Sequence, residues 1–160
     1  MPIRTWLVAH DFSPCASAAA RAAVADAIDG RTDTKIVLCH AFLVPPPPTA
    51  IEMSGFGEYA NALAESATQR LQQEADVLLK EVGSLRRTHV ASPVVEVETK
   101  LCSGTATEEI LAVARELGVA RMYLGTHGRT GAAHLFLGSI AERIARLATV
   151  PVVIVKEREG

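Results

Sequence analysis

One glycine-rich stretch decides the fold of this chain: residues 125–139, GTHGRTGAAHLFLGS. It holds four glycines, two histidines and an arginine, and glycine this dense needs a reason because it loses more conformational entropy on folding than other residues. The apolar run RMYL precedes the stretch, and the amphipathic stretch IAERIARLA follows it. The sequence therefore predicts a strand, a glycine-rich loop and a helix in this order.

The same alternation extends over the rest of the chain. Apolar runs predict five strands, at residues 3–10, 35–42, 94–102, 119–125 and 151–156. Amphipathic stretches predict four helices, at residues 14–29, about 58–81, 105–118 and 139–148. Strands that alternate with helices in one domain indicate an α/β fold, a parallel sheet with helices on both faces. Right-handed crossovers place each strand-to-helix loop at the carboxyl edge, where such sheets bind ligands.

Helix signals support this assignment. Ser13 is a favourable N-cap, Pro14 a favourable first helical residue, and Gly30 and Gly118 are expected to end their helices. The second helix carries apolar residues spaced by three or four positions, which predicts one continuous apolar face. These residues are Leu63, Ala67, Leu71, Ala75, Leu78 and Val82.

Composition excludes several classes of protein. The chain has 160 residues, 49% hydrophobic and 4% aromatic, with a formal net charge of −2. This gives a single domain with an aliphatic core and no basic surface for nucleic acid. The N-terminus lacks a signal-peptide run, and no stretch is long enough to span a bilayer. Cys15, Cys39 and Cys102 have no C-x-x-C spacing, so we expect reduced thiols in a cytoplasmic protein, buried as small core residues.

A proline-rich loop, residues 43–57, interrupts the alternation with the sequence LVPPPPTAIEMSGFG. The four prolines of Pro45–Pro48 cannot donate backbone hydrogen bonds and favour the extended polyproline conformation. We interpret the loop as an exposed linker, with a functional flap as the alternative.

The glycine-rich stretch does not match the common phosphate-binding loops. A Walker A loop needs G-x-x-x-x-G-K-S/T, but Thr130 and Ala133 stand five residues after Gly125 and Gly128, and no lysine follows. The dinucleotide fingerprint needs G-x-G, which does not occur in the stretch. The spacing that fits is Gly125, two residues, Gly128, nine residues, then Gly138 and Ser139.

This spacing, G-x2-G-x9-G-S/T, resembles the ATP-binding signature of the universal stress protein family. The similarity continues through residues 124–156, and includes DFSP at residues 11–14, CHA at 39–41 and GTATEEILAVARELGV at 104–119. The resemblance implies a single Rossmann-like domain over residues 1–160, of the adenine nucleotide alpha hydrolase type. It also implies a five-stranded parallel sheet in the order 3-2-1-4-5.

The implied ligand is ATP, with Mg²⁺ carried by its phosphates. Bare backbone at Gly125 and Gly128 suits a close approach of phosphate oxygens. Gly138 and Ser139 begin the last helix, so free amides and the positive end of the helix dipole would face the same anion. Arg129 supplies a positive charge.

Ser139 and Glu142 also have the S-x-x-E spacing of a capping box. We expect Ser139 to serve both as a phosphate ligand and as part of this box.

In proteins of the family, the aspartate at the position of Asp11 approaches the adenosine end of the nucleotide; the alternative role for Asp11 is to cap the first helix together with Ser13. The resemblance places the backbone of Ala41 against adenine, and Ala9 and His10 at the border of the same pocket. The complete set of predicted ligand-binding residues is Ala9, His10, Asp11, Ala41, Gly125, Thr126, His127, Gly128, Arg129, Thr130, Gly131, Gly138, Ser139 and Ile140.

A metal site is an alternative interpretation of the same edge. His10, His40 and His127, with Cys39 nearby, have the chemistry of zinc ligands, but no two of them have a recognised ligand spacing. We therefore interpret the histidines as lining of the nucleotide pocket and predict no metal ligand.

No catalytic base or Walker B aspartate is recognisable, so we predict no catalytic residue. The sequence favours an ATP-binding stress-response protein that senses or reports nucleotide state, with at most slow hydrolysis or autophosphorylation. The alternatives are a scaffold from the branch of the family that binds no nucleotide, and a flavodoxin-like redox protein.

The predicted edge strands differ in charge. The third strand carries Glu96, Glu98 and Lys100, which protect an open edge. The fifth carries Val152, Val153, Ile154 and Val155, without a charge. An uncharged edge and the family resemblance both predict a homodimer that pairs the fifth strands antiparallel. The alternative is that residues 157–160 fold back over this edge.

Overall fold

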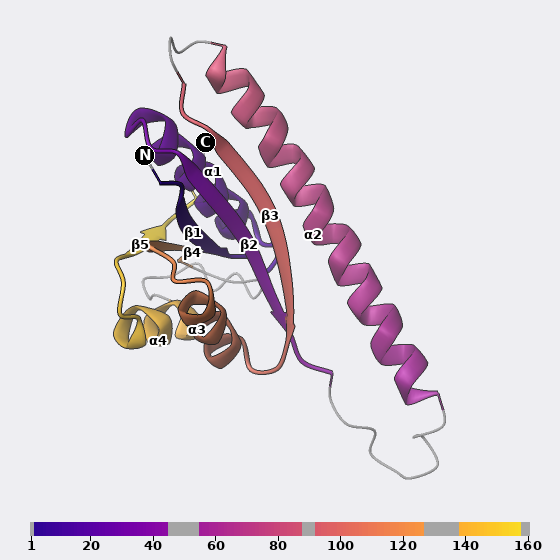
Figure 1. Ribbon diagram of the computed structural model, residues 1–160. Helices are drawn as coiled ribbons and strands as arrows, with labels where there is room; N and C mark the ends of the chain where they lie inside the picture. Colours follow the sequence, from indigo (N-terminus) through magenta and orange to yellow (C-terminus); the bar gives the residue numbers. More distant parts are fainter. Residues whose placement is uncertain (1, 45–54, 88–91, 127–137, 158–160) are drawn as a thin grey trace.

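The computed structural model describes residues 2–44, 55–87, 92–126 and 138–157 (Figure 1). Within these ranges strands and helices alternate as predicted. The elements are β1 (Arg4–Ala9), α1 (Pro14–Asp29), β2 (Thr34–Phe42), α2 (Phe56–Arg86), β3 (Val95–Ser103), α3 (Ala106–Glu116), β4 (Arg121–Gly125), α4 (Ser139–Leu147) and β5 (Val152–Val155). The prolines of Pro45–Pro48 lie outside the described residues.

The strands form one parallel sheet in the order β3-β2-β1-β4-β5, which confirms the predicted order. The central strand β1 pairs with both β2 and β4, so Val8 lies between Leu38 and Tyr123. The chain places β2 and β3 on one side of β1, and then β4 and β5 on the other side. The strand order therefore reverses at β1. The crevice between the carboxyl ends of β1 and β4 is therefore the usual ligand position in such a sheet.

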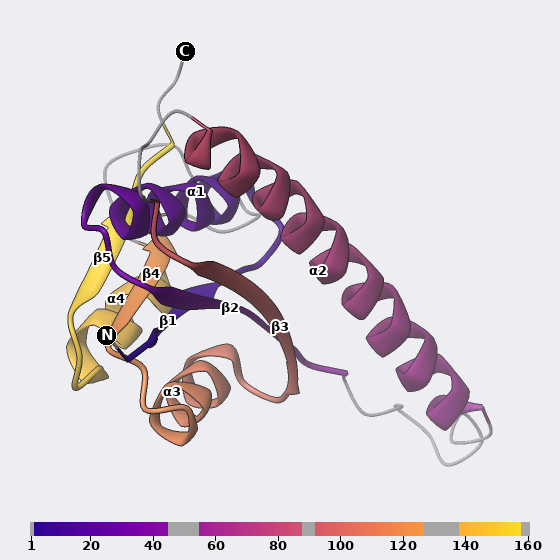
Figure 2. The same cartoon turned by 45° about the horizontal axis from the view of Figure 1, so that its top comes forward.

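Helices α1 and α2 lie on one face of the sheet, and α3 and α4 lie on the other (Figure 2). Trp6 and Val8 pack in the layer of α1 and α2. Leu7 points to the opposite face, where it packs with Met122 and with Ile144 of α4, in the layer of α3 and α4. This division follows from the alternation of side chains along β1.

Local signals predicted the start of α1. Pro14 is its first residue, and the hydroxyl oxygen of Ser13 accepts a hydrogen bond from the Ala16 N–H at 3.2 Å. The helix ends at Gly30 as predicted, but Gly30 keeps a right-handed conformation and the next residue, Arg31, adopts φ = 48°. Arg31 thus occupies the left-handed position that usually favours glycine.

The end of α3 follows the usual pattern. Gly118 has φ = 56° just beyond the helix, and its N–H donates to the Arg115 carbonyl. The Val119 N–H donates to the Ala114 carbonyl at 3.1 Å, which completes a Schellman motif.

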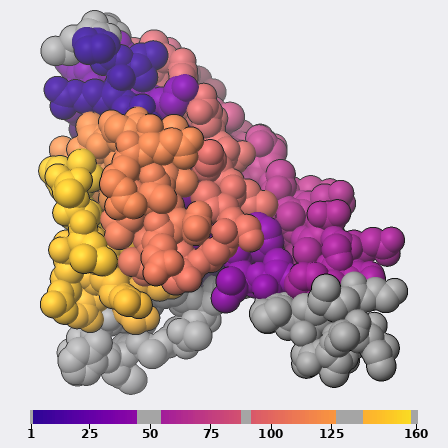
Figure 3. All heavy atoms as spheres, turned by 60° about the horizontal axis from the view of Figure 1, so that its bottom comes forward, coloured from indigo at the N-terminus to yellow at the C-terminus, as the bar shows by residue number. Residues whose placement is uncertain are grey.

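Helix α2 is longer than predicted, and only part of its apolar face is buried. Leu63 and Ala67 are half-buried, because the N-terminal half of α2 extends beyond the sheet (Figures 1 and 2). Figure 3 shows the helix, in magenta, projecting from the rest of the molecule. The buried residues belong to the C-terminal half: Leu71, Ala75, Leu78 and Val82.

The two edges of the sheet are the predicted ones. On β3, Glu98 forms an ion pair of 2.7 Å with Lys35 of β2. On β5, all four residues from Val152 to Val155 are half-buried. No helix in the described ranges is long and apolar enough to cross a bilayer.

Candidate functional site

A cavity of about 470 Å³ opens at the carboxyl edge of the sheet, at the reversal of strand order. Nine of the predicted ligand-binding residues line it together: Ala9, His10, Asp11, Ala41, Gly125, Thr126, Gly138, Ser139 and Ile140. The other five lie outside the described residues: His127, Gly128, Arg129, Thr130 and Gly131. The structure thus brings segments far apart in the sequence to one cavity.

Helix α3 contributes a wall of the cavity that no sequence motif predicts. Ala106 and Ile110 line this wall, and Ala16 and Ala141 add further small apolar surface. These residues belong to no chemical motif. The available signal was positional, since α3 begins at the carboxyl edge directly after β3.

Gly125 has a packing role that its sequence neighbours do not indicate. A Cβ at this position would lie 2.7 Å from the Cys15 Cβ and 2.8 Å from the carbonyl carbon of Cys15, closer than real contacts allow. The first turn of α1 therefore packs directly on the end of β4 and requires a glycine there. This contact explains Gly125 without the approach of a phosphate.

The start of α4 corrects two predictions. The Gly138 carbonyl accepts the Glu142 N–H at 2.9 Å, so Gly138 is the N-cap and Ser139 the first helical residue, and the predicted capping box is absent. The Gly138 N–H donates to the Thr126 carbonyl at 2.7 Å, so this amide is not free. No side chain in the described part of the chain caps α4. The N–H groups at 139–141 therefore have no partner within the helix, and all three residues line the cavity.

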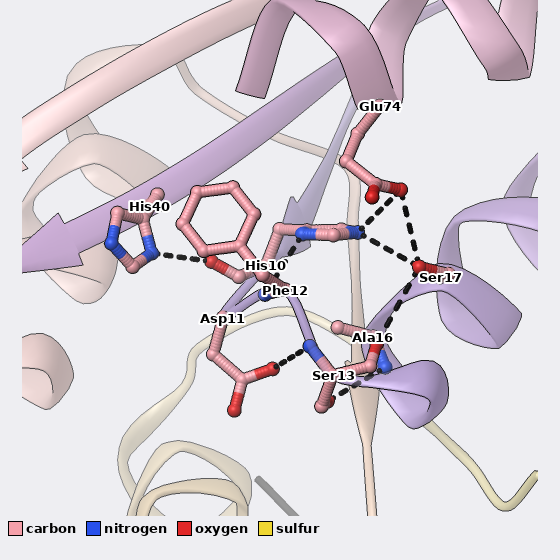
Figure 4. Close-up of polar contacts among 8 residues, drawn as sticks. All are labelled: His10, Asp11, Phe12, Ser13, Ala16, Ser17, His40 and Glu74. Carbon is pink, nitrogen blue, oxygen red and sulfur yellow. Dashed lines mark hydrogen bonds and ion pairs between the residues drawn. The ribbon is translucent and has the colours of Figure 1, made fainter. Parts of the chain in front are cut away.

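The loop between β1 and α1 brings Asp11 to the cavity (Figure 4). One carboxylate oxygen of Asp11 accepts the Ser13 N–H at 3.0 Å, while the Ser13 hydroxyl caps α1. Between them, Phe12 has φ = 66°, a left-handed conformation that is unfavourable for an aromatic residue. Asp11 thus shapes the loop and lines the cavity, so its two predicted roles are compatible.

Two buried histidines belong to the hydrogen bonding of this loop. His40 donates from Nδ1 to the His10 carbonyl at 2.7 Å. The Nδ1 atom of His10 accepts the Phe12 N–H at 3.2 Å, which assigns the ring proton to Nε2. Burial lowers the pKa of His10 below 6.5, although the carboxylates of Glu74 and Asp11 act in the opposite direction. His10 is therefore neutral at pH 7.

Most of the candidate metal ligands and all of the cysteines lie in the described part of the chain. Within this part, no group of three or more histidine, cysteine, aspartate or glutamate side chains is placed to hold a metal ion; His127 lies outside. The Sγ atoms of Cys39 and Cys102 are 3.9 Å apart in the core, and burial raises the pKa of both thiols. Both cysteines stay protonated at neutral pH, as expected of small core residues.

Comparison with known sequences identifies relatives of this chain. The sequence profile of the universal stress protein family matches residues 2–156. The universal stress protein MJ0531 of Methanocaldococcus jannaschii is 30% identical over 108 residues, which are 67% of this chain and 61% of that protein. YxiE of Bacillus subtilis is 37% identical over 62 residues, 39% of this chain and 42% of YxiE. The aligned segments thus span less than two thirds of the relatives' own lengths.

Solved structures share the fold. The protein MJ0577 has a TM-score of 0.75 at 24% identity, over 100% of both chains. A universal stress protein from Archaeoglobus fulgidus, solved in complex with dAMP, has a TM-score of 0.63 at 16% identity, over 97% of this chain and 98% of its own. Another, solved with cAMP, has a TM-score of 0.54 at 18% identity, over 98% of each chain. With a family profile that spans nearly its whole length and a fold that agrees, this chain belongs to the universal stress protein family.

Proposed function

We propose that the cavity binds ATP and that the protein is a nucleotide-responsive member of its family, acting in the cytoplasm. One observation carries the proposal: a single cavity at the reversal of strand order is lined both by Asp11 and by the start of α4, which no described side chain caps. The carboxylate of Asp11 suits a hydrogen-bond donor at one end of a ligand. The positive start of α4 suits an anion at the other end. The dAMP and cAMP complexes of two structural neighbours support an adenine nucleotide.

The adenosine moiety would occupy the part of the cavity near β1, β2 and α3. Ala9, Ala41 and Ala106 give this part small apolar side chains, which leave room for a flat ring, and Ile110 adds apolar surface. The Asp11 carboxylate would accept a hydrogen bond from a ribose hydroxyl or from the adenine amino group.

The phosphates would lie at the start of α4. Three backbone N–H groups of residues 139–141 and the positive end of the helix dipole favour an anion there. The Ser139 side chain is exposed and adds a hydroxyl donor. Mg²⁺ would arrive with the phosphates, and Arg129 would add a positive charge. We assign no residue a catalytic role, so the proposal accommodates only slow hydrolysis or autophosphorylation.

We also propose a homodimer that pairs two β5 strands antiparallel. The described part of β5 is an uncharged edge with half-buried side chains, a type of edge that proteins rarely leave open.

The experiment that tests ATP binding is a thermal shift. A ligand that binds only the folded state at about 100 times its Kd adds about 2.7 kcal/mol of stability. For a chain of this size that corresponds to a Tm increase of about 5–10 °C. We expect this increase with ATP and Mg²⁺, and no increase with flavin mononucleotide.

Two variants of α3 locate the binding. Ala106→Leu places a larger side chain in the cavity and should abolish the thermal shift. Ala112 lies on the exposed face of the same helix, so Ala112→Leu should keep the shift. A wild-type protein without a shift at millimolar ATP would refute nucleotide binding and favour a scaffold. A shift that survives in Ala106→Leu would place the ligand elsewhere.

A further inference from the structure

The loop between β1 and α1 needs external support to keep its shape. Phe12 adopts φ = 66°, where its Cβ is crowded against the backbone, and the loop around it would relax into other conformations unless its surroundings hold it. Asp11 lies directly before Phe12 and lines the cavity. The position of the Asp11 carboxylate therefore depends on what holds Phe12.

Arg70 of α2 holds the Phe12 ring. The guanidinium carbon of Arg70 lies 4.1 Å from the centre of the ring, the geometry of a cation–π contact. The ring also contacts the imidazole of His40, at 4.4 Å between centroids, and that of His10, at 5.6 Å (Figure 4).

Glu74, one turn further along α2, holds both ends of the loop. Its Oε2 atom accepts a hydrogen bond of 3.1 Å from the hydroxyl of Ser17 in α1, after the loop. The same oxygen lies 3.6 Å from Nε2 of His10, before the loop (Figure 4). The Glu74 side chain is 35% exposed and that of His10 is fully buried, so this contact is partly shielded from water.

Arg70 and Glu74 are four residues apart, so they share one face of α2. No residue of α2 is among the described residues that line the cavity. Any effect of these two side chains on the ligand must therefore pass through the loop or through long-range charge.

We propose that Arg70 and Glu74 are positioning residues, which hold the loop so that Asp11 faces the ligand and thereby set the affinity of the cavity for its nucleotide. This inference rests on the proposed function of the cavity and adds α2 as the element that tunes it. The physical basis is preorganisation. The measured Kd equals the intrinsic Kd divided by the fraction of molecules in the binding-competent conformation.

The test is the Kd of ATP with Mg²⁺, measured by isothermal titration calorimetry. Arg70→Gln removes the cation above the ring and should raise the Kd about two- to fivefold, the range of an exposed cation–π contact. Glu74→Ala removes the nearest acceptor of the Ser17 hydroxyl and should raise the Kd about fivefold or more. The conservative changes Arg70→Lys and Glu74→Gln keep the cation and the acceptor, and should recover most of the affinity.

Matched controls lie on the exposed surface of the same helix. Lys80→Gln and Glu65→Ala remove the same charges from α2 at positions away from the loop, and both should keep the wild-type Kd. The Tm of each variant without ligand shows whether it is folded.

A double-mutant cycle separates positioning from long-range charge. If Arg70 acts through the ring, Phe12→Leu should raise the Kd, and adding Arg70→Gln should raise it no further. If Arg70 instead attracts the phosphates from a distance, the two effects would multiply, which would overturn the proposal.

Two further outcomes are distinguishable. Wild-type binding that is unchanged in Arg70→Gln and Glu74→Ala would overturn the positioning role and leave nucleotide binding intact. A wild-type protein that does not bind ATP would overturn both.

Discussion

Some residues at the two ends of α1 have conformations that the local sequence predicts, and others do not. The cap at Ser13 and the helix start at Pro14 were predictable, because both depend on neighbours in the sequence. The left-handed conformations of Phe12 and Arg31 were not predictable, because neither residue type favours them. At Phe12 the surrounding contacts come from residues distant in sequence, among them Arg70 and His40.

His10 makes the stability of the fold depend on pH. Burial lowers its pKa below the ordinary 6.5, so the folded protein takes up this proton at lower pH than the unfolded chain. Its contribution is complete above pH 6.5 and is lost as the pH falls from 6.5 toward the pKa of the folded state. The charged or titratable groups around His10 are Glu74, Asp11, His40 and Arg70.

The variant His10→Asn tests this dependence, because asparagine keeps an acceptor for the Phe12 N–H but does not titrate. We expect the free energy of urea unfolding to fall less in the variant than in the wild type between about pH 7.5 and about pH 5.5. The other histidines titrate in both proteins, so their contributions cancel when the two changes in unfolding free energy are compared. Equal pH dependence in both proteins would contradict a neutral, buried His10.

At the scale of elements, the period of the sequence predicted each helix and strand, and their alternation together with the family resemblance predicted the strand order. The apolar face of α2 was predictable, but the restriction of its buried residues to the C-terminal half was not, because periodicity reports that a helix has an apolar face and not what covers it. The N-cap of α4 was misplaced by one residue. Gly138 is the N-cap instead of Ser139, and its amide bonds to the Thr126 carbonyl, a contact that no local motif contains.

The end of α1 offers a stabilising substitution. Arg31 has φ = 48°, and its N–H donates to the Ile28 carbonyl at 3.1 Å, so the position needs a left-handed residue. Arg31→Gly removes the crowding of the Cβ and should raise the free energy of unfolding by about 0.5–1 kcal/mol, after subtraction of the greater entropy of glycine in the unfolded chain. Arg31→Ala keeps the Cβ and should give no such gain in urea unfolding. Equal effects of the two substitutions would refute the explanation.

The edge strand β5 leads to a prediction about assembly. Static light scattering of the wild type should give twice the monomer mass of 17.0 kDa. The Met122 N–H donates to the Pro151 carbonyl, and the Thr126 N–H donates to the Val155 carbonyl. The backbone N–H and C=O groups of the odd-numbered residues of β5 thus point toward β4. The N–H of Ile154 therefore faces the open edge.

Ile154→Pro removes this outward donor and should shift the mass toward that of the monomer. The conservative change Ile154→Val keeps the donor and should remain a dimer. A wild type that is monomeric at micromolar concentration would contradict pairing through β5.

At the scale of the whole molecule, the sequence predicted which segments meet better than it predicted what each residue does there. All nine described candidate residues line one cavity, because parallel strands bring their following loops to the same edge. The role of Gly125 in packing against Cys15 and the wall formed by α3 depend on three-dimensional contacts between elements, which no local motif contains. The support of the loop by α2 is of the same kind.

Titration of isotope-labelled protein with ATP and Mg²⁺, followed through the backbone amide resonances, tests the central claim most directly. We predict saturable shifts at the amides that line the cavity, among them Asp11, Ala41, Gly125 and Ser139. The groove between the ends of α3 and α4, lined by Leu111, Val119 and Leu147, serves as an internal control and should stay unchanged. Spectra without shifts at millimolar ATP, or shifts confined to that groove, would contradict a nucleotide site at the carboxyl edge of the sheet.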